Sequence, residues 1–206
     1  MGLTRTHAAP CIHFARRNPP LRQSFLHDMR FVAAALMVVT LAEANAQAPY
    51  RQTSDIPFVP TSQAVIEAML KLANVQSGDL LVDLGSGDGR IPILAAKQTG
   101  CRAIGVELDH ALILESRAAA EREGVAGQVQ FIEGDLFRQD LRKATVVTMF
   151  LLPSVNLRLK PKLLQELAPG SRIVAHRFDL GNWKPDRTLN VEGEPVYLWI
   201  VSSTKH

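Results

Sequence analysis

Residues 80–90 read Leu-Leu-Val-Asp-Leu-Gly-Ser-Gly-Asp-Gly-Arg, and this stretch decides the fold. It predicts an apolar strand that passes an acid, Asp83, and leads through a turn into a helix that begins at Arg90. Glycines occupy every second position of the turn, at Gly85, Gly87 and Gly89. Because glycine has no Cβ, such a backbone turns sharply and lies close to a ligand. A strand, a glycine-rich turn and a helix in this order indicate a nucleotide-type binding site.

The glycine spacing distinguishes two classes of ligand. Dinucleotide-binding folds favour G-x-G-x-x-G, but here the spacing is G-x-G-x-G and Arg90 stands where the third glycine would lie. This disfavours a dehydrogenase. The run from Asp83 resembles motif I of the class I S-adenosylmethionine-dependent methyltransferases. That resemblance implies S-adenosylmethionine as cofactor, with Asp83 facing its cationic methionine end. It also implies that the backbone of Gly85, Ser86, Gly87 and Gly89 lies against the cofactor.

A second acid ends the next predicted strand, Arg102-Ala-Ile-Gly-Val-Glu107. In doubly wound folds an acid at this place accepts hydrogen bonds from the ribose hydroxyls. We therefore predict that Glu107 binds the ribose. Asp109 is the alternative acid, but its place before residues 110–122 suits a helix N-cap.

A third acid follows the strand that begins at Gln128, in the sequence Gly-Asp135-Leu136. A Gly-Asp pair after a strand is most often only a turn. In the methyltransferase pattern, however, such an aspartate accepts from the adenine amino group and its neighbour packs on the ring. This assigns Asp135 and Leu136 to the adenine. The acids would then line one edge of a parallel sheet, where such folds bind ligands.

Strand and helix patterns alternate through the rest of the chain, which predicts an α/β fold with a Rossmann-like, mostly parallel sheet. The last two strands, over 186–191 and 196–201, are expected to form an antiparallel pair at its edge. Helices are predicted over 61–73, with Thr61 as N-cap, and over 90–98, 111–123 and 154–167.

The N-terminal sequence pattern predicts a cleaved targeting segment and not a part of the folded domain. Residues 1–28 are expected to be an upstream extension, with Met29 as the initiator. Residues 29–46 combine a basic start, a short apolar run and an Ala-x-Ala ending, as in a secretory signal peptide cut after Ala46. An organelle transit peptide is the alternative. A lead-in segment (47–60) and the catalytic domain (61–206) follow. Export to the periplasm conflicts with a cofactor made in the cytosol, so the cytosolic face of the membrane is the second expectation.

Charge and metal-ligand patterns exclude other classes of protein. Residues 1–46 hold five arginines and two acids, whereas the remaining 160 residues hold 18 basic and 18 acidic side chains. A neutral domain gives no case for a nucleic-acid partner. The histidines do not pair with acids or cysteines at metal-ligand spacing, so no metal is expected.

Three further segments narrow the resemblance. They read Ile56-Pro-Phe-Val-Pro-Thr-Ser-Gln63, Phe150-Leu-Leu-Pro-Ser-Val155 and Val174-Ala-His-Arg-Phe178. With the glycine turn, they resemble the mitochondrial protein-lysine methyltransferases that act on the ATP synthase c subunit and the adenine nucleotide translocase, over residues 56 to 184. The resemblance implies a seven-strand fold and methylation of a lysine amine on a protein substrate, with membrane proteins among the candidates.

The fourth strand is predicted to end at the acceptor. Methyl transfer is an in-line displacement, so the protein mainly aligns the amine and excludes water. No Asn or Asp stands here, so we assign alignment to the backbone carbonyls of Leu151 and Leu152, with Pro153 fixing the turn. Ser154 is either a further contact or the N-cap of the next helix. An ordinary core strand is the alternative for this apolar run.

Other residues near the acceptor have less specific signals. His176 is either a general base or a buried core histidine. By position, Phe178 is predicted to wall the acceptor channel, and Phe58, Pro60 and Thr61 to form a lid. Two other functions stay open: a small-molecule methyltransferase, and an exported, catalytically silent binding protein on the same scaffold.

Overall fold

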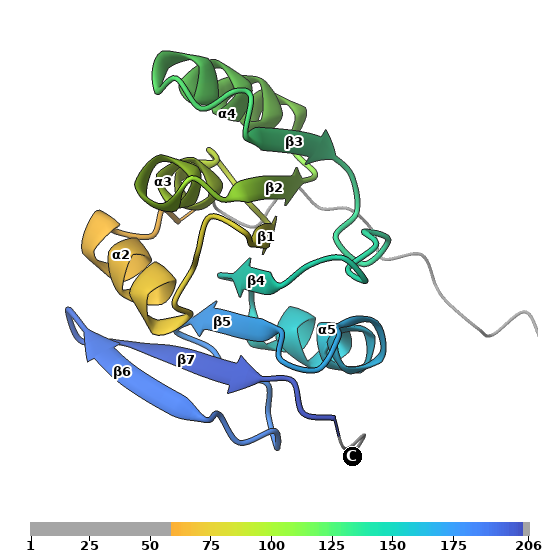
Figure 1. The fold of residues 1–206 in the computed structure, drawn as a ribbon. Helices are drawn as coiled ribbons and strands as arrows, with labels where there is room; N and C mark the ends of the chain where they lie inside the picture. The colour runs from red at the N-terminus through yellow and green to blue at the C-terminus, as the bar shows by residue number, and fades with distance from the viewer. Residues whose placement is uncertain (1–58, 204–206) are drawn as a thin grey trace, which may run out of the picture. The chain divides into compact units, whose positions relative to one another are not determined.

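The computed structural model describes residues 59–203 of the 206-residue chain. The predicted extension (1–28), the signal segment (29–46) and Phe58 lie outside the described residues. Seven strands form one sheet in the order β3-β2-β1-β4-β5-β7-β6 (Figure 1). In chain order they are β1 (Leu80–Leu84), β2 (Arg102–Glu107), β3 (Val129–Glu133), β4 (Val146–Met149), β5 (Arg172–His176), β6 (Arg187–Val191) and β7 (Glu194–Ile200).

The first five strands run parallel, and β7 lies antiparallel between β5 and β6. This confirms the predicted α/β class, the mostly parallel sheet and its antiparallel C-terminal pair. Glu192 and Gly193 join β6 to β7 with positive φ angles of 55° and 86°. Such a two-residue turn matches the twist of a hairpin.

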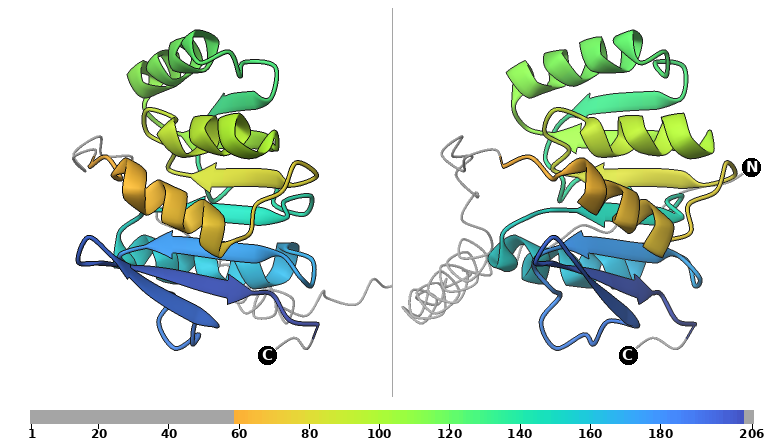
Figure 2. Two further views of the ribbon diagram at one scale, coloured as in Figure 1. Left: turned by 60° about the vertical axis from the view of Figure 1, so that its left-hand side comes forward. Right: turned by 90° about the vertical axis from the view of Figure 1, so that its left-hand side faces the viewer.

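Helices cover the two faces of the sheet unequally. Helices α2 (Gln63–Leu72), α3 (Arg90–Thr99) and α4 (His110–Arg122) lie on one face, and α5 (Pro153–Glu166) lies on the other (Figures 1 and 2). Val155, Leu159 and Leu163 of α5 are buried in the core on that second face, beside strand residues such as Trp199. None of the helices in this described part is long and apolar enough to cross a membrane.

Two predicted helix N-caps are wrong, one by a single residue and the other by two. Helix α2 is capped by Ser62, whose Oγ accepts from the Val65 N–H at 3.3 Å, and not by Thr61. Helix α5 begins at Pro153 with Leu152 in the N-cap position, so exposed Ser154 lies inside the first turn and is not the cap. Proline suits the first helical position because the N–H that it lacks would have no intrahelical partner.

Phe131 of β3 lies beneath the glycine turn and explains two glycines, one in the turn and one in β2. A Cβ on Gly89 would lie 2.5 Å from Phe131 Cζ, and a Cβ on Gly105 of β2 would lie 2.6 Å from its Cδ1. Gly89 also has φ +80°, which L-residues with side chains rarely adopt. The turn therefore rests directly on a core aromatic ring.

Candidate active site

Asp83, Glu107 and Asp135 lie at or just after the carboxyl ends of three adjacent strands, β1, β2 and β3. The sheet brings them to one edge, as the chain spacing predicts. The carboxyl ends of β4 and β5 adjoin this edge and bring Phe150 and His176 beside it. The predicted cofactor and acceptor residues therefore meet along one side of the sheet.

Asp83 is a buried carboxylate with one unused oxygen. Its side chain is 1% exposed, and Oδ1 accepts from Thr148 Oγ1 of β4 at 2.7 Å. Oδ2 has no partner among the described residues. The pKa of Asp83 is raised to about 7, mainly by burial and in part by the neighbouring Glu107 and Asp88, while the Thr148 hydrogen bond lowers it. A cationic ligand group would use the free oxygen and favour the ionised form.

Glu107 holds the glycine turn from the next strand. Its Oε2 accepts from the Gly87 N–H at 3.0 Å, and its Oε1 accepts from the N–H groups of Leu108 and Asp109 at 2.7 and 3.0 Å. Asp109 itself caps α4 by accepting from the N–H of Ala111 at 2.8 Å. This confirms the N-cap role of Asp109 and leaves Glu107 as the acid facing the turn.

Asp135 and Leu136 lie in the segment between β3 and β4 and are half-buried. Asp135 Oδ1 accepts from the Phe137 N–H at 2.9 Å, which closes a local turn. Leu136 packs against the core on the α5 face of the sheet. This geometry suits a turn that presents an acid and an apolar side chain together, and the adenine assignment stays a prediction.

Three aromatic rings wall the ends of β4 and β5. The Phe150 ring centroid lies 4.1 Å from that of His176 and 6.5 Å from that of Phe178. His176 is buried, its Nδ1 lies 3.3 Å from Thr61 Oγ1, and its Nε2 has no partner among the described residues. Burial lowers the pKa of His176, so the imidazole is neutral at pH 7.

A strained turn positions Phe178 in this group of three rings. The Phe178 N–H donates to the His176 carbonyl at 2.8 Å around Arg177, which has φ +68°. This is a γ-turn, a conformation that costs free energy and persists where the surroundings hold it. Buried Asn156 of α5 supplies such support, since its Nδ2 donates to the Phe178 carbonyl at 3.0 Å.

The structure separates the two carbonyls predicted to align the acceptor. The Leu152 carbonyl accepts from the N–H groups of Val155 and Asn156 at 2.9 and 3.0 Å, so it is engaged by the start of α5. Its assignment therefore needs correction, and the Leu151 carbonyl remains as the candidate. The Leu151 side chain lies against the glycine turn, where a Cβ on Gly85 would fall 2.6 Å from Leu151 Cδ2.

The segment before α2 is tied to both halves of the site. Asp88 and Arg90 form an ion pair with 2.6 Å between Oδ2 and Nη2, and Arg90 Nη1 donates to the Thr61 carbonyl at 3.0 Å. Thr61 is 4% exposed and also reaches His176, whereas Pro60 is exposed. The sequence reasoning missed this use of Arg90 and the Thr148–Asp83 contact. A lone polar residue inside Val146-Val-Thr-Met149 was the available signal for Thr148.

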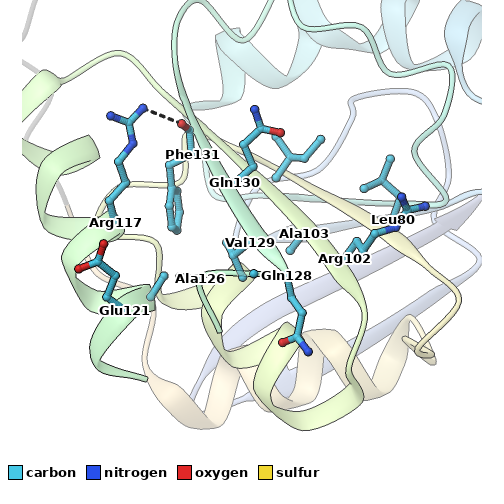
Figure 3. Close-up of a pocket in the computed structure, with 13 residues that line it drawn as sticks. Leu80, Arg102, Ala103, Arg117, Glu121, Ala126, Gln128, Val129, Gln130 and Phe131 are labelled. Atoms are coloured by element: carbon cyan, nitrogen blue, oxygen red, sulfur yellow. Dashed lines mark hydrogen bonds between the residues drawn. The ribbon is translucent and has the colours of Figure 1, made fainter. Parts of the chain in front are cut away.

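Figure 3 shows a pocket away from this edge, over β3. Its polar lining includes Arg102, Gln128 and Gln130, and Arg117 donates to the Phe131 carbonyl at 2.9 Å. It contains none of the predicted site residues. Among residues 59–203, no group of three His, Cys, Asp or Glu side chains could hold a metal.

The site fits S-adenosylmethionine in its own geometry: an unpartnered buried carboxylate oxygen, a positive-φ glycine turn and a second acid on that turn. Fold and site together define a class I S-adenosylmethionine-dependent methyltransferase, and this molecule is the cofactor. A family model described as the ANTKMT methyltransferase domain matches residues 83–187. The chain belongs to this methyltransferase family.

Relatives support the assignment over most of their length. A protein-lysine N-methyltransferase from Saccharolobus islandicus is 44% identical over 155 residues, which are 73% of this chain and 96% of the relative. The lysine N-methyltransferase of the ATP synthase c subunit from Rattus norvegicus is 36% identical over 174 residues, or 84% and 80% of the two chains. A crystal structure described as an RNA methyltransferase from Salinibacter ruber with S-adenosyl-L-homocysteine is 50% identical, with a TM-score of 0.70 over 71% of this chain and 95% of that one.

Proposed function

We propose that this chain transfers the methyl group of S-adenosylmethionine to the amine of a lysine in a protein substrate. The observation that carries the proposal is the aromatic wall of Phe150, His176 and Phe178 beside the cofactor edge. A lysine amine has an ordinary pKa near 10.4 and must be neutral to attack. An apolar wall favours the neutral amine over the ammonium ion. Two relatives whose names specify lysine support the same acceptor.

Each cofactor contact is assigned to a residue already placed at the edge. Asp83 Oδ2 accepts from the cationic methionine end, and Glu107 Oε2 accepts from a ribose hydroxyl beside the turn of Gly85, Ser86, Gly87 and Gly89. Asp135 and Leu136 take the adenine. When bound, S-adenosylmethionine supplies a methyl group on a sulfonium, an electrophile that needs no further activation.

The chain's own contribution is alignment and exclusion of water. The Leu151 carbonyl accepts a hydrogen bond from the incoming amine, and this contact directs the lone pair of the amine nitrogen toward the methyl group. Pro153 fixes the turn that follows, and Phe178 closes the side of the channel. His176 contributes a neutral aromatic surface, because its ring is buried between Phe150 and Thr61. The proton of the product amine leaves to solvent.

Pro60 and Thr61 act as a lid, and Phe58, the third residue of that prediction, lies outside the described residues. The support is the double anchorage of Thr61 to Arg90 and His176. Replacing Thr61 by Val keeps the shape and removes the hydroxyl, and we expect the KM for S-adenosylmethionine to rise about fivefold, the worth of one hydrogen bond. Steady-state kinetics would measure it, with Thr188→Val on exposed β6 as the matched control. If wild type and Thr61→Val had the same KM and the same kcat, the lid proposal would be wrong.

We further propose that the substrate is a membrane-embedded protein with an accessible lysine, and that the enzyme acts at the cytosolic face of the membrane. The first rests on the relative named for the ATP synthase c subunit, and the second on where the cofactor is made.

The acceptor test uses the full-length chain with labelled S-adenosylmethionine. We expect label on an ATP synthase c subunit in detergent, at a lysine located by mass spectrometry, and none when that lysine is replaced by Arg. A structured RNA and a panel of small amines serve as rival acceptors. Label on RNA or on small amines with none on protein would overturn the proposal.

A further inference from the structure

Helix α5 exposes apolar residues on its outer side, next to the acceptor end of the site. Leu152 and Leu157 are 43% and 51% exposed, and Pro153 and Pro161 are exposed as well. Leu157 and Pro161 are one turn apart, so they lie on one stripe opposite the buried residues of the helix. Single exposed leucines are ordinary, but exposed apolar residues grouped beside the acceptor end of the site mark a contact surface.

Positive charges flank this stripe. Arg158 and Lys160 come from the same helix, and the Lys160 ammonium donates to the Asn182 side chain in the segment after β5. That segment also carries Lys184 and Trp183. We name the surface of Leu152, Leu157, Arg158, Lys160 and Pro161 the α5 surface.

The basic and acidic side chains are unevenly distributed between the two halves of the domain. Residues 59–133, which supply α2, α3 and α4, carry six basic and ten acidic side chains. Residues 134–187, which supply α5 and the segments packed around it, carry ten basic and five acidic side chains. Helix α5 lies on the opposite face of the sheet from α2, α3 and α4 (Figures 1 and 2), so the exposed apolar residues of α5 lie in the more basic part of the chain.

We infer that the α5 surface docks on an anionic lipid bilayer. Exposed leucines flanked by cations match an interfacial helix, whose apolar side chains enter the headgroup boundary while cations meet lipid phosphates. An RNA-binding surface would instead place cations and aromatic rings at its centre. Pro161 has no N–H to bond the Leu157 carbonyl, which suits the hydrated headgroup level and not the hydrocarbon.

Docking in this way turns the acceptor entrance toward the bilayer. Leu152 follows Phe150 and Leu151 directly in the chain, so the α5 surface adjoins the aromatic wall of the site. The benefit for a membrane-embedded lysine rests on the proposed function, whereas the lipid contact itself does not. Vesicle binding without cofactor therefore tests this inference separately from methyl transfer.

The test places a polarity-sensitive dye on each face of the full-length chain. The chain has two cysteines, at 11 and 101, and Cys101 is fully buried. In a Cys11→Ser background, Leu157→Cys is labelled, and Leu114→Cys on α4 is the matched control because Leu114 is 53% exposed. We expect a blue shift at 157 and none at 114 on phosphatidylcholine vesicles containing phosphatidylglycerol. The site-specific label reads the face in contact even if another segment also binds lipid.

Affinity provides the second measurement. In co-sedimentation with the same vesicles, Leu157→Ser is expected to weaken binding about tenfold and Lys160→Gln about fivefold, with Leu114→Ser unchanged. Salt at about 1 M is expected to remove most of the Lys160 effect. Equal shifts at 157 and 114, or no shift at either, would overturn the inference. RNA binding that depends on Lys160 but not on Leu157, with no dye shift on vesicles, would reassign the surface to nucleic acid.

Discussion

Replacing Asp83 by Asn is expected to weaken the binding of S-adenosylmethionine on the order of 100-fold. The Asp83 carboxylate is buried, and a charge-assisted hydrogen bond from a buried carboxylate to a cationic group contributes about 1.5–3 kcal/mol. Asparagine keeps the shape and can still accept from Thr148, so the loss isolates the charge. Calorimetric titration of the full-length chain measures the affinity directly.

The same residue predicts a pH dependence. With a pKa of about 7, Asp83 is largely protonated at pH 6 in the free protein, so binding of a cation must release that proton. The affinity of the wild type is therefore expected to rise with pH, and to be about fivefold weaker at pH 6 than at pH 7. This difference should vanish in Asp83→Asn.

Asp79 offers a matched control beside the same strand. It is 7% exposed, pairs with Arg172 and lies at the opposite end of β1. Asp79→Asn is expected to lower the melting temperature while leaving the affinity of the folded protein for S-adenosylmethionine unchanged. If Asp83→Asn bound the cofactor as tightly as wild type, the assignment of the methionine end to Asp83 would be wrong.

Glu107→Gln is the second substitution with a large expected effect, again on the order of 100-fold in affinity. Glu107 already accepts from three backbone N–H groups, so Oε2 can accept from one ribose hydroxyl, and the charge of that hydrogen bond contributes about 1.5–3 kcal/mol. An amide nitrogen would also face an N–H of Gly87 or of Leu108, which disturbs the turn that Glu107 holds. Titration with S-adenosylmethionine and with S-adenosyl-L-homocysteine should show equal losses, because both carry the ribose.

Glu133 provides the control for Glu107. It ends the neighbouring strand in register with Glu107, but its side chain is 49% exposed and pairs with His110. Glu133→Gln is therefore expected to change the affinity little. Similar losses in the two variants would mean that general charge near the edge, and not the ribose contact, explains the effect.

The strand-and-helix order could be predicted because local patterns encode it. Apolar runs such as 80–84 and 172–176 became strands, and the three acids met at one edge because parallel strands end together. Helix starts were predicted less well, because Thr61 and Ser62 are both good caps and the contacts that engage Thr61 come from Arg90 and His176, 29 and 115 positions away.

The finer site geometry depends on contacts that no local pattern encodes. The Phe150–His176 ring contact joins two strands through the fold of the sheet, and the γ-turn at Arg177 carries no glycine to signal a positive φ. The role of the Leu152 carbonyl depended on where α5 begins, and Pro153 places the N-cap two residues before Ser154. The N-terminal predictions, including the signal segment and Phe58, lie outside the described residues and stay predictions.

Phe131 links two properties that are usually treated as separate. Its ring belongs to the core, yet it also shapes the floor under Gly89 and Gly105. A core substitution there would reach the cofactor without touching it, and a change in the turn would reach the core. A substitution at Phe131 is therefore expected to change the stability of the fold and the binding of the cofactor together. Selection for activity thus also limits which residues this core position can hold.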